Sequence, residues 1–153
     1  MKKVSHSSLA LICFLQLIAG IATAQQRPNI IYIMSDDHDA DAISAYNSKL
    51  IKTPQIDRIA QEGMRFNSAF VGNSICGPAR ATLLTGQHSH LNGMIDNHRA
   101  FDASKMTMPR LLQQAGYQTA IVGKWHLGAS QAMHPLKRGF DEFFGFLGGQ
   151  ALP

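Results

Sequence analysis

Residues 107–126 read TMPRLLQQAGYQTAIVGKWH, and this stretch carries a helix signal followed at once by a strand signal. Thr107 with a proline two residues later is typical of a helix start, and Gly116 is typical of a helix end. The apolar, β-branched run over 117–122 predicts a buried strand. The polar segment 123–126 comes directly after it. We therefore expect a helix that leads into a strand, with polar side chains at the carboxyl end of that strand.

The same alternation of strand and helix signals continues along the rest of the chain. The continuous apolar run NIIYIM over 29–34 predicts another buried strand, and 64–71 alternates weakly as a strand does. Helices are predicted within 53–63 and over 78–85. The tail over 139–149 is rich in Phe and Gly and shows no clear period. Together these signals predict an α/β fold, with a mostly parallel sheet flanked by helices on both faces.

The composition is that of an ordinary globular protein. The chain has 153 residues, of which 45% are hydrophobic and 16% are charged, and its formal net charge is +4. These values exclude a collagen-like repeat, a coiled coil and a disordered chain. The lysines and arginines form no block, so no nucleic-acid partner is expected.

The first 24 residues are typical of an export signal. Lys2 and Lys3 form a basic start, 9–21 is apolar, and an Ala-Thr-Ala cleavage site ends at Ala24. The apolar run is short for a membrane span. We expect cleavage near Ala24, a periplasmic or secreted protein and no stable membrane anchor. An uncleaved N-terminal anchor is the alternative.

Cysteine usage raises a specific question. Cys13 lies inside the export signal, so Cys76 would be the one cysteine in the rest of the sequence. A lone cysteine in an oxidising compartment forms no intramolecular disulfide. A helix starting near Pro78 would place its N-terminus beside Cys76, which favours an anionic or oxygen-rich group there. Arg80 could reach the same point, whereas the simpler alternative is a buried structural thiol.

Polar side chains follow two of the predicted strands. Asp36 and Asp37 come directly after 29–34, and Lys124 and His126 come directly after 117–122. Parallel strands present their carboxyl ends at one sheet edge, where α/β proteins bind ligands. Adjacent carboxylates repel unless a cation lies between them, and such oxygen ligands suit Ca²⁺ or Mg²⁺. The alternative is a solvated acidic loop, a surface lysine and a loop histidine.

Three of these segments resemble the signatures of type I sulfatases. CGPARATLLTG over 76–86 resembles their pattern C-x-P-x-R-x-x-x-L-T-G, and GYQTAIVGKWH over 116–126 resembles their second pattern. Asp36–Asp37 is similar to the first metal-ligand pair of that family. The resemblance extends over 28–146 and implies an alkaline-phosphatase-like fold, incomplete at the C-terminus. It implies that 25–153 is the N-terminal part of a sulfatase catalytic domain, preceded by the signal peptide.

The resemblance implies a covalent modification of Cys76. A formylglycine-generating maturase would oxidise it to formylglycine, whose hydrated aldehyde carries two hydroxyls on one carbon. One hydroxyl would attack the sulfur of a sulfate ester, and the alcohol would depart. The second hydroxyl would then lose its proton, and the covalent sulfate would be expelled as the aldehyde re-forms. The resemblance also implies Ca²⁺, rather than Mg²⁺, bound by Asp36, Asp37 and the modified Cys76.

The resemblance implies roles for three further residues. Arg80 would neutralise charge near the hydrated aldehyde, and Lys124 would hold a sulfate oxygen. His126 would bind the second hydroxyl and assist its deprotonation. The second pair of metal ligands, with another histidine and lysine, lies beyond the matched stretch in this family.

The substrate class follows from the resemblance as well. The local sequence over 73–76 and 88–93 is most similar to that of sulfatases acting on N-acetylglucosamine 6-sulfate. This resemblance implies that the substrate is a sulfated carbohydrate or glycosaminoglycan. His88, His90 and Arg99 are candidate substrate-binding residues, with solvated loop residues as the alternative. Two other functions stay open: a phosphatase or phosphonate hydrolase of the same superfamily, and a catalytically inactive truncated fragment or carbohydrate-binding remnant.

Overall fold

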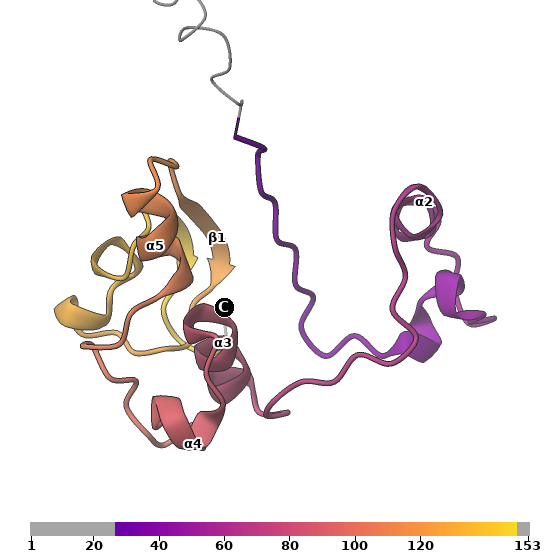
Figure 1. The fold of residues 1–153 in the computed structure, drawn as a ribbon. Helices are drawn as coiled ribbons and strands as arrows, with labels where there is room; N and C mark the ends of the chain where they lie inside the picture. The colour runs from indigo at the N-terminus through magenta and orange to yellow at the C-terminus, as the bar shows by residue number, and fades with distance from the viewer. Residues whose placement is uncertain (1–26, 150–153) are drawn as a thin grey trace, which may run out of the picture. The chain divides into compact units, whose positions relative to one another are not determined.

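The computed structural model describes residues 27–149. These residues fall into two compact units, one ending at Arg65 and the other beginning at Phe66 (Figure 1). The predicted signal peptide lies outside the described residues. Within the described part of the chain, no helix has the length and apolar character that crossing a membrane requires.

The first unit consists of short helices and extended chain. Its helices are two 3₁₀ turns, η1 (Ala40–Ala42) and η2 (Ser44–Tyr46), and one α-helix, α2 (Pro54–Glu62). The predicted helix within 53–63 is therefore confirmed, with Pro54 in its first turn and Gly63 after its last residue. Proline has the helical φ angle and lacks the N–H that a first turn leaves unbonded, so it suits this position.

A hydroxyl and carboxylate cluster joins α2 to η2. The Ser44 backbone N–H donates to the Thr53 hydroxyl at 3.0 Å, and the Ser44 hydroxyl donates to Asp57 at 2.6 Å. The Thr53 hydroxyl also donates to the Asp57 carboxylate at 3.0 Å. Thr53 therefore makes no side-chain cap bond to a backbone N–H of α2, and its hydroxyl instead ties this helix to the preceding turn.

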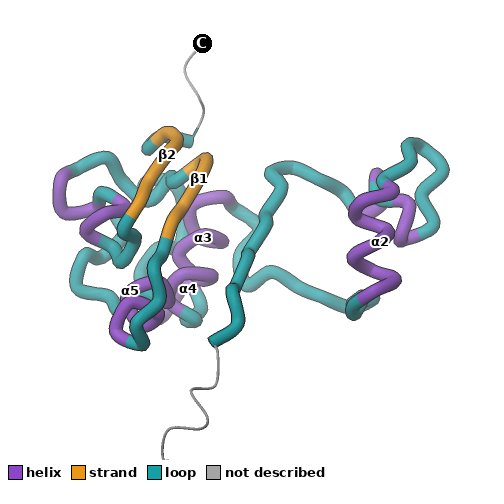
Figure 2. Tube along the Cα trace, turned by 90° about the horizontal axis from the view of Figure 1, so that it is seen from above, coloured by secondary structure: helices purple, strands orange, loops and turns teal. Residues whose placement is uncertain are grey.

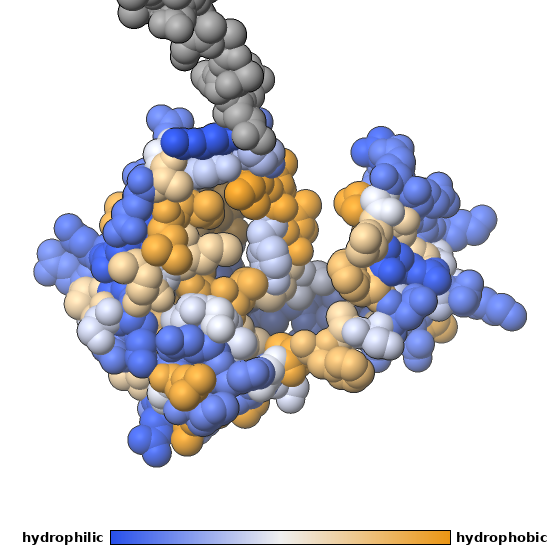
Figure 3. Space-filling view, in the orientation of Figure 1, coloured by the Kyte–Doolittle hydropathy of each residue, from blue (hydrophilic) through white to orange (hydrophobic). Residues whose placement is uncertain are grey.

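Two predicted strands are absent from the described structure. Residues 29–34 are extended but form no strand, and their side chains are exposed, with Ile31 at 82% and Ile33 at 81%. No strand forms over 64–71 either. An extended segment becomes a strand only when a neighbour accepts and donates its backbone hydrogen bonds. No described strand pairs with either segment, and their apolar residues add to the exposed apolar surface that Figure 3 shows in orange.

The second unit contains a parallel pair of strands. Strands β1 (Ala120–Lys124) and β2 (Glu142–Phe146) lie side by side in Figure 2, with Ala120 opposite Glu142 and Lys124 opposite Phe146. The strand predicted over 117–122 is confirmed with a shift toward the C-terminus. Strand β2 falls in the tail over 139–149, where the sequence showed no clear period. Its side chains follow no strict alternation of burial, which explains why the pattern did not reveal it.

The second unit also contains several helices and turns. They are α3 (Cys76–Thr85), α4 (Ser89–Asn92), α5 (Met108–Gln114), η3 (Gln131–Met133) and η4 (Pro135–Lys137). Helix α3 packs against α4 and α5, and η4 packs against β2. The helices predicted over 78–85 and after Thr107 are confirmed, and α3 begins two residues earlier than predicted, at Cys76 itself. The predicted α/β class, with a parallel sheet and helices, is confirmed.

The apolar core of the second unit lies around Trp125. This indole is 1% exposed, meets the Phe140 ring edge-on at 6.1 Å and donates its Nε1–H to the Met133 carbonyl at 3.0 Å. Leu127, also 1% exposed, belongs to the same cluster. Full burial of an indole is tolerated here because its one polar atom has a hydrogen-bond partner. The core therefore holds the chain firmly at the carboxyl end of β1.

Candidate functional site

Cys76 is the first residue of α3 and is half-buried. Ile75, just before it, has an extended backbone and no side chain that could cap the helix. The cap comes from a distant residue, because the Gly77 backbone N–H donates to Asn97 Oδ1 at 3.0 Å. Asn97 Nδ2 donates to Cys76 Sγ at 3.5 Å. The first turn of α3 thus presents a thiol held by a side-chain amide. The sequence did not predict the contact between Asn97 and Cys76, because no local signal links residues 21 positions apart.

Gly77 leaves no room for a side chain. A Cβ at this position would lie 2.6 Å from Met94 Cε, 2.9 Å from Asn97 Oδ1 and 3.5 Å from the His126 carbonyl oxygen. The absence of a Cβ therefore lets the chain over 94–97 and the chain after β1 close on the start of α3. This close approach is what brings His126 to the neighbourhood of Cys76.

The carboxyl end of β1 is shaped by a glycine on each strand. Gly123 faces Gly145 across the pair, and a Cβ on Gly145 would lie 1.9 Å from the Gly123 carbonyl oxygen. The ladder then continues past the strand, since the His126 N–H donates to the Leu147 carbonyl at 3.1 Å. His126 is half-buried and has a φ of 59°, in the left-handed region that few non-glycine residues adopt. Such a backbone, sustained by the surrounding contacts, is common at functional sites.

A side chain from α3 ties the helix to this strand end. Arg80 Nη1 donates to the Lys124 carbonyl at 2.7 Å, and Arg80 Nε is buried with no hydrogen-bond partner among the described residues. A buried guanidinium nitrogen without an acceptor is costly, and a bound anion or oxygen-rich group would satisfy it. The structure therefore brings together Cys76, Arg80, Lys124 and His126, which the sequence placed in two separate motifs.

The aspartate pair belongs to the other unit. Asp36 and Asp37 are exposed, and Asp37 has a φ of 47°, so the chain turns sharply just after the extended run. Carboxylate oxygens suit Ca²⁺, which takes six to eight oxygen ligands, and two aspartates would supply part of such a shell. Over residues 27–149, no three His, Cys, Asp or Glu side chains gather as a metal site would require. The metal-ligand role of Asp36, Asp37 and Cys76 stays a prediction.

The predicted substrate-binding residues lie on the surface of the second unit. His88 and His90 are exposed, and their rings stack on each other with centroids 5.9 Å apart. Arg99 is exposed two residues after Asn97, and its backbone N–H donates to Asp96 at 3.0 Å. No structural contact assigns these three residues a substrate, so their role stays a prediction.

The start of β1 is held by a carboxylate. Asp141 accepts hydrogen bonds from the Thr119 N–H at 2.8 Å and from the Thr119 hydroxyl at 3.0 Å. Gln113, on α5, donates to the same carboxylate at 2.6 Å. The bonds from Thr119 hold the pKa of Asp141 below its usual value, because they stabilise the ionised carboxylate. Asp141 thus fastens the helix, β1 and the start of β2 to one another.

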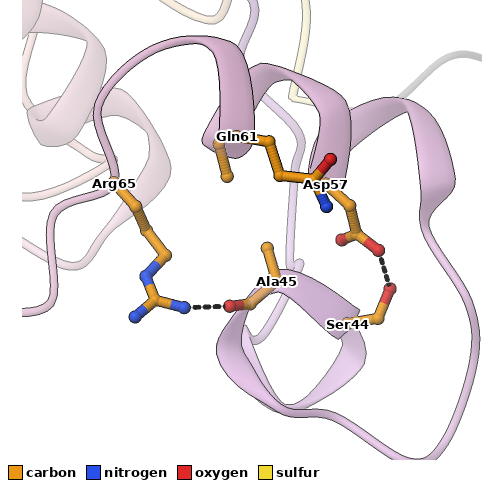
Figure 4. Close-up of a pocket in the computed structure, with 6 residues that line it drawn as sticks. Ser44, Ala45, Asp57, Gln61 and Arg65 are labelled. Atoms are coloured by element: carbon orange, nitrogen blue, oxygen red, sulfur yellow. Dashed lines mark hydrogen bonds between the residues drawn. The ribbon is translucent and has the colours of Figure 1, made fainter.

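A pocket of about 300 Å³ is present within the first unit. It is lined by Ser44, Ala45, Asp57, Ala60, Gln61 and Arg65. Figure 4 shows the bond from Ser44 to Asp57 and the bond from Arg65 to the Ala45 carbonyl at its wall. Its charged groups already have partners inside the protein, and no residue of the Cys76 cluster contributes to it. The cluster around Cys76 is therefore the candidate site.

Known proteins share both the sequence and the fold of this region. The model of the Sulfatase family matches residues 28–153. An N-acetylglucosamine-6-O-sulfatase of Bacteroides thetaiotaomicron is 49% identical over 129 residues, which are 82% of this chain and 23% of that protein. The N-acetylgalactosamine-6-sulfatase of Homo sapiens is 40% identical over 139 residues, 82% of this chain and 27% of that protein.

A solved structure agrees with these sequence matches. It is of a protein in complex with its substrate D-glucosamine-2-N,6-O-disulfate, with a TM-score of 0.71 and 50% identity over 77% of this chain and 23% of that one. The chain spans about a quarter of the length of these relatives. The family match covers all of the residues that form the Cys76 cluster. This chain belongs to the sulfatase family.

Proposed function

We propose that the protein hydrolyses a sulfate ester on a carbohydrate, with a formylglycine made from Cys76 as its nucleophile. The relatives support the substrate class, because one is named for N-acetylglucosamine 6-O-sulfate and another for N-acetylgalactosamine 6-sulfate. The solved relative holds a sulfated glucosamine. An amino sugar sulfated at its 6-oxygen is therefore the substrate we propose.

The observation that carries this proposal is the convergence of two motifs on one point. Cys76 opens α3, and Arg80 on the same helix donates to the backbone of Lys124 at the end of β1. His126 follows directly, at a left-handed position beside Gly77. These contacts run through the backbone of Lys124 and His126, and they support a site to which the side chains of both motifs would contribute.

Each residue of the cluster has a distinct chemical task. The Arg80 guanidinium, anchored through Nη1, would offer its unpartnered Nε–H to an oxygen on the modified Cys76 or on the sulfate. Lys124 would hold a sulfate oxygen as charge develops in the transition state. His126 would accept the proton of the second hydroxyl, which lets the aldehyde re-form and releases sulfate.

Ca²⁺ is the metal we propose for this site. Asp36 and Asp37 would supply hard oxygen ligands, and the modified Cys76 would supply another. The ion would polarise the nucleophilic hydroxyl and a sulfate oxygen when bound. If calcium is required, chelation should abolish turnover, and added Ca²⁺ should restore it better than Mg²⁺. Full activity in the chelated protein would contradict this assignment.

We also propose that the protein is exported and cleaved after Ala24. N-terminal sequencing of the exported protein should then begin at Gln25. An intact N-terminus on membrane-bound protein would instead indicate an uncleaved anchor.

The modification of Cys76 is the direct test of the mechanism. The protein would be co-expressed with a formylglycine-generating maturase, and the peptide containing Cys76 would be examined by mass spectrometry. We expect the mass loss that accompanies replacement of a thiol by an aldehyde. A thiol that stays unmodified in every preparation would contradict the proposed mechanism.

Two substitutions separate the nucleophile from the fold. Cys76→Ala should abolish turnover and leave the melting temperature close to that of the unmodified protein. Cys76→Ser retains one hydroxyl but has no second one to expel the sulfate, so it should show no sustained turnover. Sustained turnover by either variant would show that Cys76 is not the nucleophile.

Comparative rates decide the ester class. We expect sulfate release from an aryl sulfate to exceed phosphate release from the matched aryl phosphate, and release from N-acetylglucosamine 6-sulfate to exceed that from the 3-sulfate. A preference for the phosphate would favour the phosphatase alternative. No turnover of either ester by maturase-treated protein carrying formylglycine would favour the inactive carbohydrate-binding alternative.

A further inference from the structure

Asn97 reaches the first turn of α3 from a bend that follows α4. It lies 21 residues from Cys76 in sequence, yet its amide contacts both Cys76 and Gly77. Oδ1 accepts from the Gly77 N–H at 3.0 Å, and Nδ2 donates to Cys76 Sγ at 3.5 Å. A single amide therefore does two things, since it caps the helix and contacts the reactive atom.

The backbone determines which way the amide faces. The Gly77 N–H can only donate, so the acceptor Oδ1 must face it and the donor Nδ2 is left for Cys76. A bond in which the thiol donates to Oδ1 is less favourable, because Cys76 Sγ lies 4.0 Å from Asn97 Oδ1. The amide oxygen and nitrogen have similar shapes, so shape alone does not decide how the Asn97 amide is oriented. The Gly77 N–H decides it, because a backbone N–H can only donate.

The space that the amide occupies exists because Gly77 has no side chain. A Cβ there would lie 2.9 Å from Asn97 Oδ1 and 2.6 Å from Met94 Cε, and Met94 is 3% exposed. Met94 is also held by its own backbone bond to the Asn92 side chain at 2.9 Å. Buried contacts of Asn92 and Met94 thus hold the start of the segment that carries Asn97.

We propose that Asn97 is a positioning residue, which orients the side chain of residue 76 by donating Nδ2–H to the atom carried on its Cβ. This inference rests on the proposed function, because that atom is sulfur in the unmodified protein and oxygen after oxidation to formylglycine. The donor is already aligned in the unmodified protein. After oxidation of Cys76, Nδ2–H would point in the same direction, because the bond from the Gly77 N–H keeps Oδ1 in place.

The substitution Asn97→Asp separates capping from positioning. Aspartate has nearly the same shape and keeps an oxygen for the Gly77 N–H, and a carboxylate near a helix N-terminus is favourable. It replaces the donor that faces Cys76 with an acceptor. The fold should therefore be kept while the hydrogen bond to residue 76 is lost. Asn97→Ala removes both contacts and should lower the melting temperature as well.

The first measurement uses the protein produced without maturase. Alkylation of Cys76 by iodoacetamide would be followed by mass spectrometry of its own peptide, at one fixed pH. Because Asp and Asn are similar in size, access to the thiol is unchanged and the alkylation rate reports how the side chain of residue 97 contacts Sγ. We expect Asn97→Asp to change the alkylation rate roughly 10-fold, since it replaces the donor that faces sulfur with an acceptor.

The second measurement uses maturase-treated protein, with turnover expressed per formylglycine. For Asn97→Asp we expect kcat to fall about 10-fold to 100-fold, with KM changed less than threefold. Asn47→Asp is the matched control, because it adds the same charge at an exposed left-handed position that aspartate also tolerates. It should leave alkylation, turnover and melting temperature unchanged.

The outcomes distinguish this inference from the proposed function. Unchanged alkylation and unchanged kcat in Asn97→Asp would overturn the positioning role while leaving the sulfatase proposal intact. Equal losses in Asn97→Asp and Asn47→Asp would assign the effect to charge alone, and would also overturn it. If the wild-type protein acquires no formylglycine, the function proposal fails, and the alkylation measurement still decides whether Asn97 orients Cys76.

Discussion

Residues 29–34 and strand β1 carry similar apolar patterns and have different structures. The earlier segment, NIIYIM, has the more continuous apolar run, yet it is extended, unpaired in the described structure and exposed. Strand β1 is interrupted by Gly123 and ends in a lysine, yet it pairs in register with β2 and leads into the buried Trp125. The stronger sequence signal therefore belongs to the segment without a strand.

The difference shows that a strand is a property of two segments. An extended chain gains its hydrogen bonds and side-chain packing from the neighbour beside it, and strand propensity reflects that packing more than the backbone itself. Strand β1 has its partner in the same unit, whereas no described strand pairs with 29–34. The following substitutions compare the packed unit with the first unit.

The largest effect is expected at the centre of the packed unit. Trp125→Ala should lower the free energy of unfolding by about 3–5 kcal/mol, because it removes a fully buried aromatic side chain and leaves a cavity. Chemical denaturation followed by circular dichroism would measure it. Phe144→Ala is the control in β2, since that ring is 79% exposed and its loss should cost far less. Equal costs would show that the core lies elsewhere.

The next effect is expected where the two strands approach most closely. Gly145→Ala would place a Cβ 1.9 Å from the Gly123 carbonyl oxygen, so the pair must separate or shift. We expect a loss of about 3 kcal/mol, together with lower turnover, because His126 follows the same ladder. Thermal unfolding would measure the loss. A variant as stable as the wild type would contradict the observed approach of the strands.

A smaller, pH-dependent effect is expected at Asp141. Hydrogen bonds from Thr119 depress the pKa of this carboxyl in the folded state below its ordinary value of 3.8. The ionised carboxylate therefore stabilises the fold above pH 3.8, and this contribution is lost as the pH falls through the lower folded-state pKa. The melting temperature of Asp141→Asn should lie below that of the wild type at pH 7. The difference should shrink in acid, and a difference constant with pH would contradict the assignment.

A modest effect is expected in the first unit. Thr53→Ala removes the hydroxyl that bonds the Ser44 N–H and Asp57, and should cost about 1 kcal/mol. Thr53→Ser retains the hydroxyl and is the matched control. Proteolysis of the 40–62 region, compared between the two variants, would detect a loss confined to this unit. Similar cleavage of both would show that the methyl group matters and the hydroxyl does not.

The smallest effect is expected in the exposed run itself. Ile31→Ala should change the free energy of unfolding by less than about 0.5 kcal/mol, because its side chain is 82% exposed. Leu127→Ala, at a position 1% exposed, should cost about 2–5 kcal/mol and provides the scale. A cost at Ile31 close to that at Leu127 would show that 29–34 is covered in solution and would remove the contrast between the two segments.

Helices were predictable because their signals are local. Pro54 and Gly63 bracket α2, and Gly116 follows α5, as expected from residues that start or stop a helix through their own backbone geometry. The residues of the Cys76 cluster were also found from sequence, because the two motifs that carry them are contiguous. Their convergence depends on a contact between distant segments, the bond from Arg80 on α3 to the Lys124 carbonyl at the end of β1.

From the sequence alone we predicted helices α2, α3 and α5, the family and the candidate residues of the site, since each depends on residues close together in the chain. Tertiary structure decided which apolar run became a strand, placed β2 in a tail without a clear period, and brought Asn97 to Cys76 from 21 residues away. These features depend on pairing and contact between distant segments. A local pattern cannot encode them, because the free energy of a strand or of a positioned side chain belongs to both partners.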